Sequence, residues 1–453
     1  MHGFGPRCAT AVLAHEGDDL NIPRETYSAI VEQTRAARLA SPSLASARSG
    51  EKDAALTAMA HALDLHSNAI LTANADDVRD ARRAAEAGEL AAAFVDRLAL
   101  DEVRLGKMAA ALRELVAAPD PVGAEDEAWV RPNGLRVAKR RIPLGVVAII
   151  YEARPNVTSD AAALCIKSGN AVVLKGGSRA LRTNRAVVAA LREGLATAGL
   201  PPDVLQFVDS ADRDAIRAVI EQEDYVDLVI PRGGEGLVRY VSQNARVPVI
   251  KHYKGVCHVY LDRAADADKA AAIAVNAKVH RPGVCNAMET LLLHADRVSD
   301  LLPLVGGRLI GEGVTLHLDA RAMEVAAAQP WFTARMCVEA RQEDLYAEYL
   351  SLDVAVAVVD DFEAAVRHIQ TYGSDHTESI VTEDYGAAEA FLNRVNSSVV
   401  LVNASTRFAD GGQLGLGAEI GISTTKLHAF GPMGLRELTT TKFVIRGDGQ
   451  VRT

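Results

Sequence analysis

The sequence predicts an α/β protein with more than one domain, the first built on a doubly wound parallel sheet. From Gly145 onward, short apolar segments alternate with segments of helical periodicity, the pattern of strands joined by helices. The 453 residues exceed what one hydrophobic core usually serves. Half of the residues are hydrophobic and only 5% are aromatic, which is typical of a globular α/β chain.

The charge and the cysteines limit the classes of function. A net charge of −10 argues against a general role at nucleic acids or membrane surfaces, although a local basic pocket could still bind an anion. No segment has the apolar length of a membrane span or of a signal-peptide core, and residues 1–24 are expected to form a loose N-terminal extension. The cysteines are few, odd in number and scattered, so we expect a reducing cytoplasm, no disulfide framework and no metal site. They are Cys8, Cys165, Cys257, Cys285 and Cys337.

The chain before the sheet is predicted to be helical and to end in a long hairpin. Glu25–Leu39 and Glu51–Ile70 have helical spacing, and alanine-rich, charged segments continue to residue 115. In the segment Trp129–Val137, Asn133-Gly134 lies between two alternating stretches, which is a strong hairpin signal. Because an isolated ribbon is marginal in water, this hairpin either pairs with another subunit or forms an ordinary sheet edge.

The parallel sheet is expected to bind a nucleotide at the carboxyl ends of its strands. The sequence has no GxGxxG fingerprint, but glycine turns follow two strands, at Lys175–Ser178 and Pro231–Gly234. The second turn opens a predicted helix, Glu235–Asn244, whose free amides could take a phosphate. Either turn alone favours a tight strand-to-helix connection, whereas two in one sheet favour a nucleotide site. The predicted strands are Val146–Ile150, Ala171–Lys175, Leu205–Val208 and Val226–Ile230, with helices at Thr158–Lys167 and Arg182–Ala198.

The segment Asn276–Thr290 is the candidate site of chemistry. A predicted helix, Asp266–Val279, leads into it, and Pro282-Gly283 then breaks any helix. Cys285 follows this break, where a thiol can project into a cleft, and the nearby cations could stabilise its thiolate. A buried structural cysteine is about as well supported by these residues alone. The cations are Lys278, His280 and Arg281.

A second α/β domain is predicted after Cys285, which places the cysteine near a domain junction. The tail from Phe408 contains so many glycines that we expect a structured loop around a site, without a regular element. The predicted strands of this part are Leu291–His294, Val314–Leu318, Val354–Val359, Ser379–Thr382 and Val399–Val402, and Leu438–Ile445 forms a last strand.

Several motifs together resemble the aldehyde dehydrogenase superfamily and, within it, the family of γ-glutamyl phosphate reductases. The motifs are Tyr151–Thr158, Ile230–Gly234, Asn276–Thr290 and Asn403–Phe408 with the glycine-rich tail. The resemblance implies an aldehyde dehydrogenase-like fold with a Rossmann-like NADP-binding domain (residues 25–125 and 144–265) and an α/β catalytic domain (266–435). It also implies an oligomerisation element made of the hairpin (126–143) and the last strand (436–453).

The resemblance assigns roles to residues of these motifs. Cys285 would be the nucleophile, and the Asn156 side-chain amide would stabilise the oxyanion beside the Cys285 backbone amide, a donor typically worth about 3 kcal/mol. The cofactor contacts would come from Lys175 at the adenosine ribose or phosphate, Gly233 and Gly234 at the pyrophosphate, and Glu348 at the nicotinamide ribose.

Two departures from the wider superfamily refine the expected reaction. Acid-forming relatives carry a glutamate that activates water, but the corresponding stretch, Val247–Gly255, has no carboxylate. A reductase needs none, because hydrolysis would waste the thioester. NAD-preferring relatives have an acidic residue near Ser178, whereas Ser178-Arg179 leaves room and charge for the 2′-phosphate of NADPH.

The implied reaction is the NADPH-dependent reduction of γ-glutamyl phosphate to glutamate 5-semialdehyde and phosphate through a cysteine thioester, a step of proline biosynthesis. Two alternatives stay open: an acid- or thioester-forming aldehyde dehydrogenase, and a nucleotide-binding protein without catalysis. The expected partners are the small-molecule substrate, further copies of the chain and, as a candidate, glutamate 5-kinase. Candidate ligands are Arg154, Lys278 and Arg281 for the phosphate, and Arg407, Lys426 and His428 for the α-carboxylate.

Overall fold

The computed structural model describes residues 22–152 and 154–452, which form two compact units. The first unit comprises residues up to 250 together with 434–453, and the second comprises residues 251–433. Most of the predicted N-terminal extension (1–24), Cys8 and Ala153 of the Tyr151–Thr158 motif lie outside the described residues. Within the described residues, no helix is both long and apolar enough to cross a membrane.

The first unit contains a four-stranded parallel sheet in the order β5-β4-β3-β6. Every residue of β3 and β4 is buried, which explains why these strands read as continuous apolar runs rather than alternating ones. The strands are β3 (Val146–Tyr151), β4 (Ala171–Lys175), β5 (Leu205–Phe207) and β6 (Leu228–Arg232), which confirms the four predicted here.

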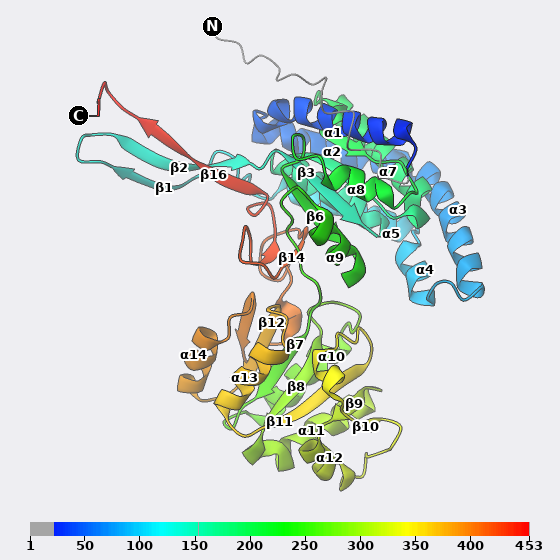
Figure 1. Ribbon diagram of the computed structural model, residues 1–453, viewed down its shortest axis with the longest axis vertical. Helices are drawn as coiled ribbons and strands as arrows, with labels where there is room; N and C mark the ends of the chain where they lie inside the picture. Colours follow the sequence, from blue (N-terminus) through cyan, green and yellow to red (C-terminus); the bar gives the residue numbers. More distant parts are fainter. Residues whose placement is uncertain (1–21, 153, 453) are drawn as a thin grey trace. The chain divides into compact units, whose positions relative to one another are not determined.

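Helices connect and cover these strands (Figure 1). The helix after β3, α6, begins at Pro155, where the missing amide costs nothing and the fixed φ suits a first turn. Of its thirteen residues all but two are buried, so it packs inside the unit. The helices of the unit are α1 (Arg24–Ala45), α2 (Ser49–Leu65), α3 (Ser67–Glu86), α4 (Ala92–Leu98), α5 (Glu102–Val116), α6 (Pro155–Lys167), α7 (Leu181–Thr197), α8 (Asp214–Ile220) and α9 (Glu235–Asn244), with 3-10 turns η1 (Ser178–Ala180) and η2 (Pro202–Val204).

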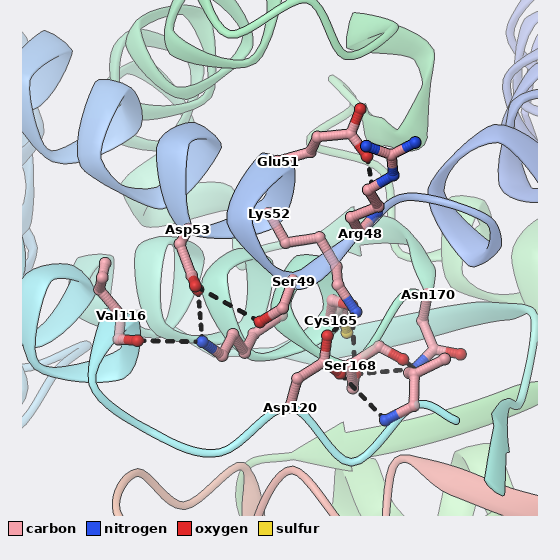
Figure 2. Close-up of polar contacts among 12 residues, drawn as sticks. Arg48, Ser49, Glu51, Lys52, Asp53, Val116, Asp120, Cys165, Ser168 and Asn170 are labelled. Atoms are coloured by element: carbon pink, nitrogen blue, oxygen red, sulfur yellow. Dashed lines mark hydrogen bonds and ion pairs between the residues drawn. The ribbon is translucent and has the colours of Figure 1, made fainter. Parts of the chain in front are cut away.

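Two buried lysines tie α2 to neighbouring segments, and Figure 2 shows the acceptor residues Asp53, Val116 and Asp120. Lys167, the last residue of α6, pairs with Asp53 of α2 and donates to the carbonyl of Val116 at 3.1 Å. Lys52 of α2 pairs with Asp120 at 2.5 Å. Because a buried ammonium is costly without a partner, the contacts of Lys167 hold the C-terminal end of α6 against α2 and the end of α5.

A three-stranded antiparallel sheet, in the order β1-β2-β16, completes the first unit. The predicted hairpin is present, with β1 (Glu125–Val130) and β2 (Arg136–Pro143), and β16 (Thr439–Arg446) pairs along β2. Gly134 has φ 86° in the connecting loop, a conformation that favours glycine. Figure 1 shows this ribbon reaching away from the helices of the same unit.

The second unit contains a seven-stranded parallel sheet in the order β10-β9-β11-β8-β7-β12-β13. All five strands predicted after Cys285 belong to it. The strands are β7 (Cys257–Leu261), β8 (Met288–His294), β9 (Thr315–Leu318), β10 (Cys337–Glu339), β11 (Asp353–Val359), β12 (Thr377–Val381) and β13 (Val399–Val402). The helices are α10 (Ala267–Val279), α11 (Val298–Gly311), α12 (Ala320–Ala327), α13 (Phe362–Tyr372) and α14 (Tyr385–Arg394), with 3-10 turns η3 (Ala295–Arg297), η4 (Gln342–Tyr346) and η5 (Thr406–Phe408).

The structure corrects two predictions about this unit. The domain boundary expected after residue 265 lies after residue 250, because β7 pairs with β8 and β12 of the second sheet and not with the first. The sequence of an apolar strand does not show which sheet it joins, so only the neighbouring strands decide where the domain boundary lies. The glycine-rich tail also holds a regular element, since β14 (Gly421–Ser423) pairs antiparallel with β15 (Gly431–Met433).

Candidate active site

Cys285 lies in a turn between α10 and β8 of the second unit. Helix α10 ends at Val279, and the amide of Ala287 donates to the carbonyl of Val284 at 3.0 Å, which closes a turn around the cysteine. Cys285 is half-buried, whereas Cys165, Cys257 and Cys337 are buried, and none of the four is in a disulfide. A thiol in a partly exposed turn has the access that a nucleophile needs.

The backbone of Cys285 is packed against Gly255 and Cys257, which precede and begin β7. A Cβ added at Gly255 would lie 1.9 Å from the carbonyl oxygen of Cys285, so only glycine fits at that position. The thiol of Cys257 donates to the same carbonyl oxygen at 3.2 Å, and burial raises its pKa well above the usual value. Cys257 therefore stays a protonated thiol that holds the backbone of Cys285.

Arg407 is a cation that the structure brings to the Cys285 turn. Its Nε lies 3.3 Å from Nδ1 of His280, and an Nη group donates to the side-chain oxygen of Asn286, the residue after Cys285. Asn286 in turn donates to the carbonyl of Ala409 at 2.9 Å. Burial lowers the pKa of Arg407, and the nearby charge of Arg281 lowers it further.

Lys278 faces the interior of the second unit rather than a ligand. Its ammonium lies 2.6 Å from a carboxylate oxygen of Glu289, and both side chains have no exposed surface. Burial is the main cause that lowers the pKa of Lys278 and raises the pKa of Glu289 to about 7. Lys278 is therefore a structural partner of Glu289, and its expected role as a phosphate ligand is corrected.

Glu348 is held next to the Cys285 turn. One of its carboxylate oxygens accepts from the amide of Gly255 at 2.9 Å, and Gly255 contacts the Cys285 backbone. Two residues further on, the amide of Leu350 donates to Glu289 at 3.4 Å. The second unit thus brings Cys285, Glu348, Arg281 and Arg407 together around one turn.

Lys426 and His428 lie in the exposed connection between β14 and β15 of the second unit. The ammonium of Lys426 is 5.9 Å from the centre of the Phe430 ring. Their predicted role at the substrate α-carboxylate stays a prediction.

Asn156 and Arg154 lie at the start of α6 in the first unit, and both side chains are exposed. The Asn156 side-chain amide donates to Asp160, one turn further along, at 3.0 Å. Burial raises the pKa of Asp160 to about 6. The contact fixes which end of the Asn156 amide faces the carboxylate, and it leaves the second N–H for another acceptor.

Lys175 ends β4, at the edge of the sheet where a nucleotide was expected. Its side chain is buried, its ammonium donates to the carbonyl of Gly176 at 2.9 Å, and burial lowers its pKa to about 8. A Cβ at Gly176 would lie 2.2 Å from the side-chain nitrogen of Asn184, so the glycine permits close packing there. Ser178 and Arg179 follow as an exposed turn, with Arg179 at 3.7 Å from Glu89.

Gly233 and Gly234 form the turn between β6 and α9, as predicted. The exposed side chain of Glu152 lies over this turn, because a Cβ at Gly233 would be 2.7 Å from its carboxyl carbon. A pyrophosphate at the start of α9 would displace this carboxylate, a feature that the sequence did not reveal.

Several residues around these sites were not singled out from the sequence. Gly255, Cys257 and Asn286 pack on or beside Cys285, and Asp160 orients Asn156. Of these four residues, only Asn286 could have been found from the sequence, because it is next to Cys285. The positions of the other three depend on contacts that the sequence does not show. Among the described residues, no group of three or more His, Cys, Asp or Glu side chains is arranged to hold a metal ion.

Comparisons with known proteins identify the family and the fold. Residues 19–309 match the aldehyde dehydrogenase family. The chain is 51% identical to a γ-glutamyl phosphate reductase of Geobacter metallireducens, over 93% of this chain and 99% of that protein. A crystal structure of a γ-glutamyl phosphate reductase from Thermotoga maritima is 42% identical, with a TM-score of 0.89 over 94% of this chain and 100% of that one.

An acetylating aldehyde dehydrogenase from Geobacillus thermoglucosidasius shares the fold at 16% identity, with a TM-score of 0.65 over 95% of this chain and 98% of that one. The fold is therefore that of the aldehyde dehydrogenases, as the sequence predicted. The identity and the nearly complete coverage of the two reductases establish that the chain belongs to the γ-glutamyl phosphate reductase family of the aldehyde dehydrogenase superfamily.

Proposed function

We propose that the protein reduces L-glutamate 5-phosphate to L-glutamate 5-semialdehyde and phosphate, as a step of proline biosynthesis, with Cys285 as the nucleophile. The observation that carries this proposal is the half-buried thiol of Cys285 in a turn held by Gly255, Cys257 and Asn286, beside the guanidinium of Arg407. The relatives in the same family support the substrate.

In the proposed mechanism, the Cys285 thiolate attacks the acyl carbon, the carbon–oxygen bond to phosphate breaks, and inorganic phosphate leaves. The product is a thioester on Cys285. Hydride addition to the thioester carbon gives a thiohemiacetal alkoxide, which expels the thiolate and releases the aldehyde. The Cys285 backbone amide stabilises the negative oxygen in both stages, a donor contributing about 3 kcal/mol. The role of Asn156 as a second donor stays a prediction.

NADPH supplies the hydride when it is bound, and the first unit has residues that fit it. Lys175 ends β4 and the Gly233-Gly234 turn follows β6. These two strands flank β3, and dinucleotides bind at the carboxyl ends of such strands. In the second unit, Glu348 would hold the nicotinamide ribose. The exposed Ser178-Arg179 turn presents a cation, which suits a 2′-phosphate.

Arg179 provides the test of cofactor choice. Its contact with Glu89 is a long, exposed ion pair, which contributes little and leaves the guanidinium available. Arg179→Ala should raise the KM for NADPH about tenfold and leave the KM for NADH unchanged. Equal effects on both cofactors would remove Arg179 from 2′-phosphate recognition.

The substitution Cys285→Ser tests the central proposal. A hydroxyl is far less ionised than a thiol near neutral pH, so NADP+ reduction in the presence of semialdehyde and phosphate should vanish. Cofactor binding, followed by NADPH fluorescence, should persist because its proposed contacts are on other segments. The matched control is Cys337→Ser, at a buried cysteine of the same unit. Phosphate-dependent turnover in the Cys285→Ser variant would exclude Cys285 as the nucleophile.

The competing acid-forming aldehyde dehydrogenase requires a carboxylate that activates water. The stretch 247–255 has none, and Glu289 is buried against Lys278. Glu348 is held by the amide of Gly255. These features favour the reductase. Release of glutamate instead of consumption of phosphate, measured with semialdehyde and NADP+, would favour the alternative.

We also propose that the β1-β2-β16 sheet joins copies of the chain. Its exposed apolar side chains include Trp129, whose ring lies 6.3 Å from that of Phe443, and Phe443 itself, which is 64% exposed. Exposed aromatic clusters of this kind are typical of interfaces. Phe443→Asp should lower the mass measured by light scattering, and an unchanged mass would exclude this surface. Cytoplasmic location and association with glutamate 5-kinase stay predictions.

A further inference from the structure

We propose that Arg281 and Arg407 form the binding site for the phosphate group of the acyl phosphate, with Asn286 and His280 holding Arg407 in position. This inference rests on the proposed function for the reaction at Cys285. It assigns Arg407 to the phosphate, where the sequence had suggested the α-carboxylate, and it excludes Lys278.

Three segments of the second unit converge on Arg407. The arginine lies on η5 after β13, His280 follows the end of α10, and Asn286 adjoins Cys285 in the nucleophile turn. Asn286 is itself fixed by its bond to the carbonyl of Ala409, two residues after Arg407. The guanidinium is therefore anchored from both sides, close to the residue that carries the thiol.

The charges around this position favour an anion. Arg281 lies near enough to Arg407 that its positive charge lowers the pKa of Arg407. Among the residues that the structure describes, the side chain of Arg281 makes no hydrogen bond or ion pair. The negative charge of Asp410 raises the pKa of Arg407, but burial and Arg281 lower it by more. The pKa of Arg407 therefore stays below its usual value. A phosphate would relieve this repulsion.

The donors of Arg407 suit a tetrahedral anion. The hydrogen bonds to His280 and Asn286 use Nε and one Nη group. Within the described part of the chain, the other Nη group donates to no residue, so it can face a ligand together with the Arg281 guanidinium. Two guanidinium groups offer the paired, planar donors that bind phosphate oxygens.

Proximity to the sulfur favours the phosphate over the α-carboxylate. The leaving oxygen is bonded to the carbon that sulfur attacks, whereas the α-carboxylate is four bonds away from that carbon. Arg407 contacts the neighbour of Cys285, and the charge of Cys285 acts on it. Lys426 and His428 remain candidates for the carboxylate.

Kinetics in the reverse direction test the assignment, because phosphate is then a substrate. Arg407→Gln and Arg281→Gln should each raise the KM for inorganic phosphate, by about tenfold or more for Arg407, with less than a twofold change for semialdehyde and NADP+. Arg407→Lys should raise the KM for inorganic phosphate as much as Arg407→Gln does. A lysine ammonium cannot contact His280, Asn286 and a phosphate at the same time. Arg335→Gln, at an exposed arginine of the same unit, is the matched control.

Alkylation of Cys285 tests the same site without turnover. Iodoacetate is an anion and iodoacetamide is neutral, so a cationic site beside the thiol favours iodoacetate. The ratio of the two alkylation rates should fall about tenfold in Arg407→Gln, with Cys285→Ser as the background. Inorganic phosphate should slow the iodoacetate reaction of the unsubstituted protein and have no effect on Arg407→Gln.

The outcomes separate this inference from the proposed function. A raised KM for semialdehyde with an unchanged KM for phosphate overturns the inference, since Arg407 would then bind the carboxylate. Unchanged constants and an unchanged alkylation ratio in both glutamine variants also overturn it. Arg281→Gln guards against misfolding, because among the described residues the Arg281 side chain makes no hydrogen bond or ion pair. If the unsubstituted protein shows no phosphate-dependent turnover, the proposed function fails, while the alkylation ratio still decides whether the anion site exists.

Discussion

Replacing Gly255 with alanine should abolish most of the activity through a single backbone contact. The added Cβ would lie 1.9 Å from the carbonyl oxygen of Cys285, 2.7 Å from its carbonyl carbon and 3.0 Å from its Cα. All three are backbone atoms, so no change of side-chain rotamer relieves the contact.

The size of the effect follows from the displacement. Ordinary van der Waals contact begins at 3.4 Å, so the methyl group and the oxygen must separate by 3.4 − 1.9 = 1.5 Å. The nucleophile turn, β7 or both must move by that amount. Because a misplacement of about 1 Å can reduce a rate about 10²-fold, we expect kcat of Gly255→Ala to fall by about 10²-fold or more.

The assay compares this variant with Gly283→Ala, two residues before the nucleophile. A Cβ at Gly283 would meet only the carbonyl oxygen of Leu350 at 3.8 Å, so this variant should keep kcat within about threefold. Phosphate-dependent NADP+ reduction gives kcat, and NADPH fluorescence reports cofactor binding, which both variants should retain. Wild-type kcat in Gly255→Ala, or an equal loss in Gly283→Ala, would refute the reasoning.

Three further predictions concern the groups around these sites. Cys257→Ala removes the donor to the Cys285 carbonyl and should lower kcat by about 2- to 10-fold. Cys257→Ser keeps a donor and should restore kcat. Equal losses of kcat in the two variants would contradict a hydrogen-bonding role. Glu289→Gln leaves Lys278 buried without a counter-ion and should lower the free energy of unfolding by about 3–5 kcal/mol, measured by urea denaturation; unchanged stability would show that the pair is dispensable. Burial raises the pKa of Asp160 to about 6 from an ordinary 3.8, so the folded state keeps its proton longer and stability falls as pH rises from about 4 to 6, by at most about 3 kcal/mol. The free energy of unfolding of Asp160→Asn should lack this dependence on pH. If the variant and the unsubstituted protein show the same pH dependence, the raised pKa does not belong to Asp160.

The fold class and most of the strands could be predicted because the signals are local. Apolar runs such as those of β3 and β4 mark buried parallel strands, and Pro282-Gly283 ends the helix before Cys285 without help from the rest of the chain. The candidate nucleophile and both glycine turns were likewise visible as short motifs. Each of these features depends on residues within a few positions of one another.

Only the tertiary structure decided which distant segments surround the cysteine. The sheet to which β7 belongs, the contact of Gly255 with Cys285, and the pairing of Lys278 with Glu289 depend on which elements pack together. Arg407 reaches Asn286 across 121 residues of sequence. No local pattern encodes such contacts, because a charged or small side chain looks the same in sequence whether it meets solvent, a carboxylate or the backbone of a nucleophile.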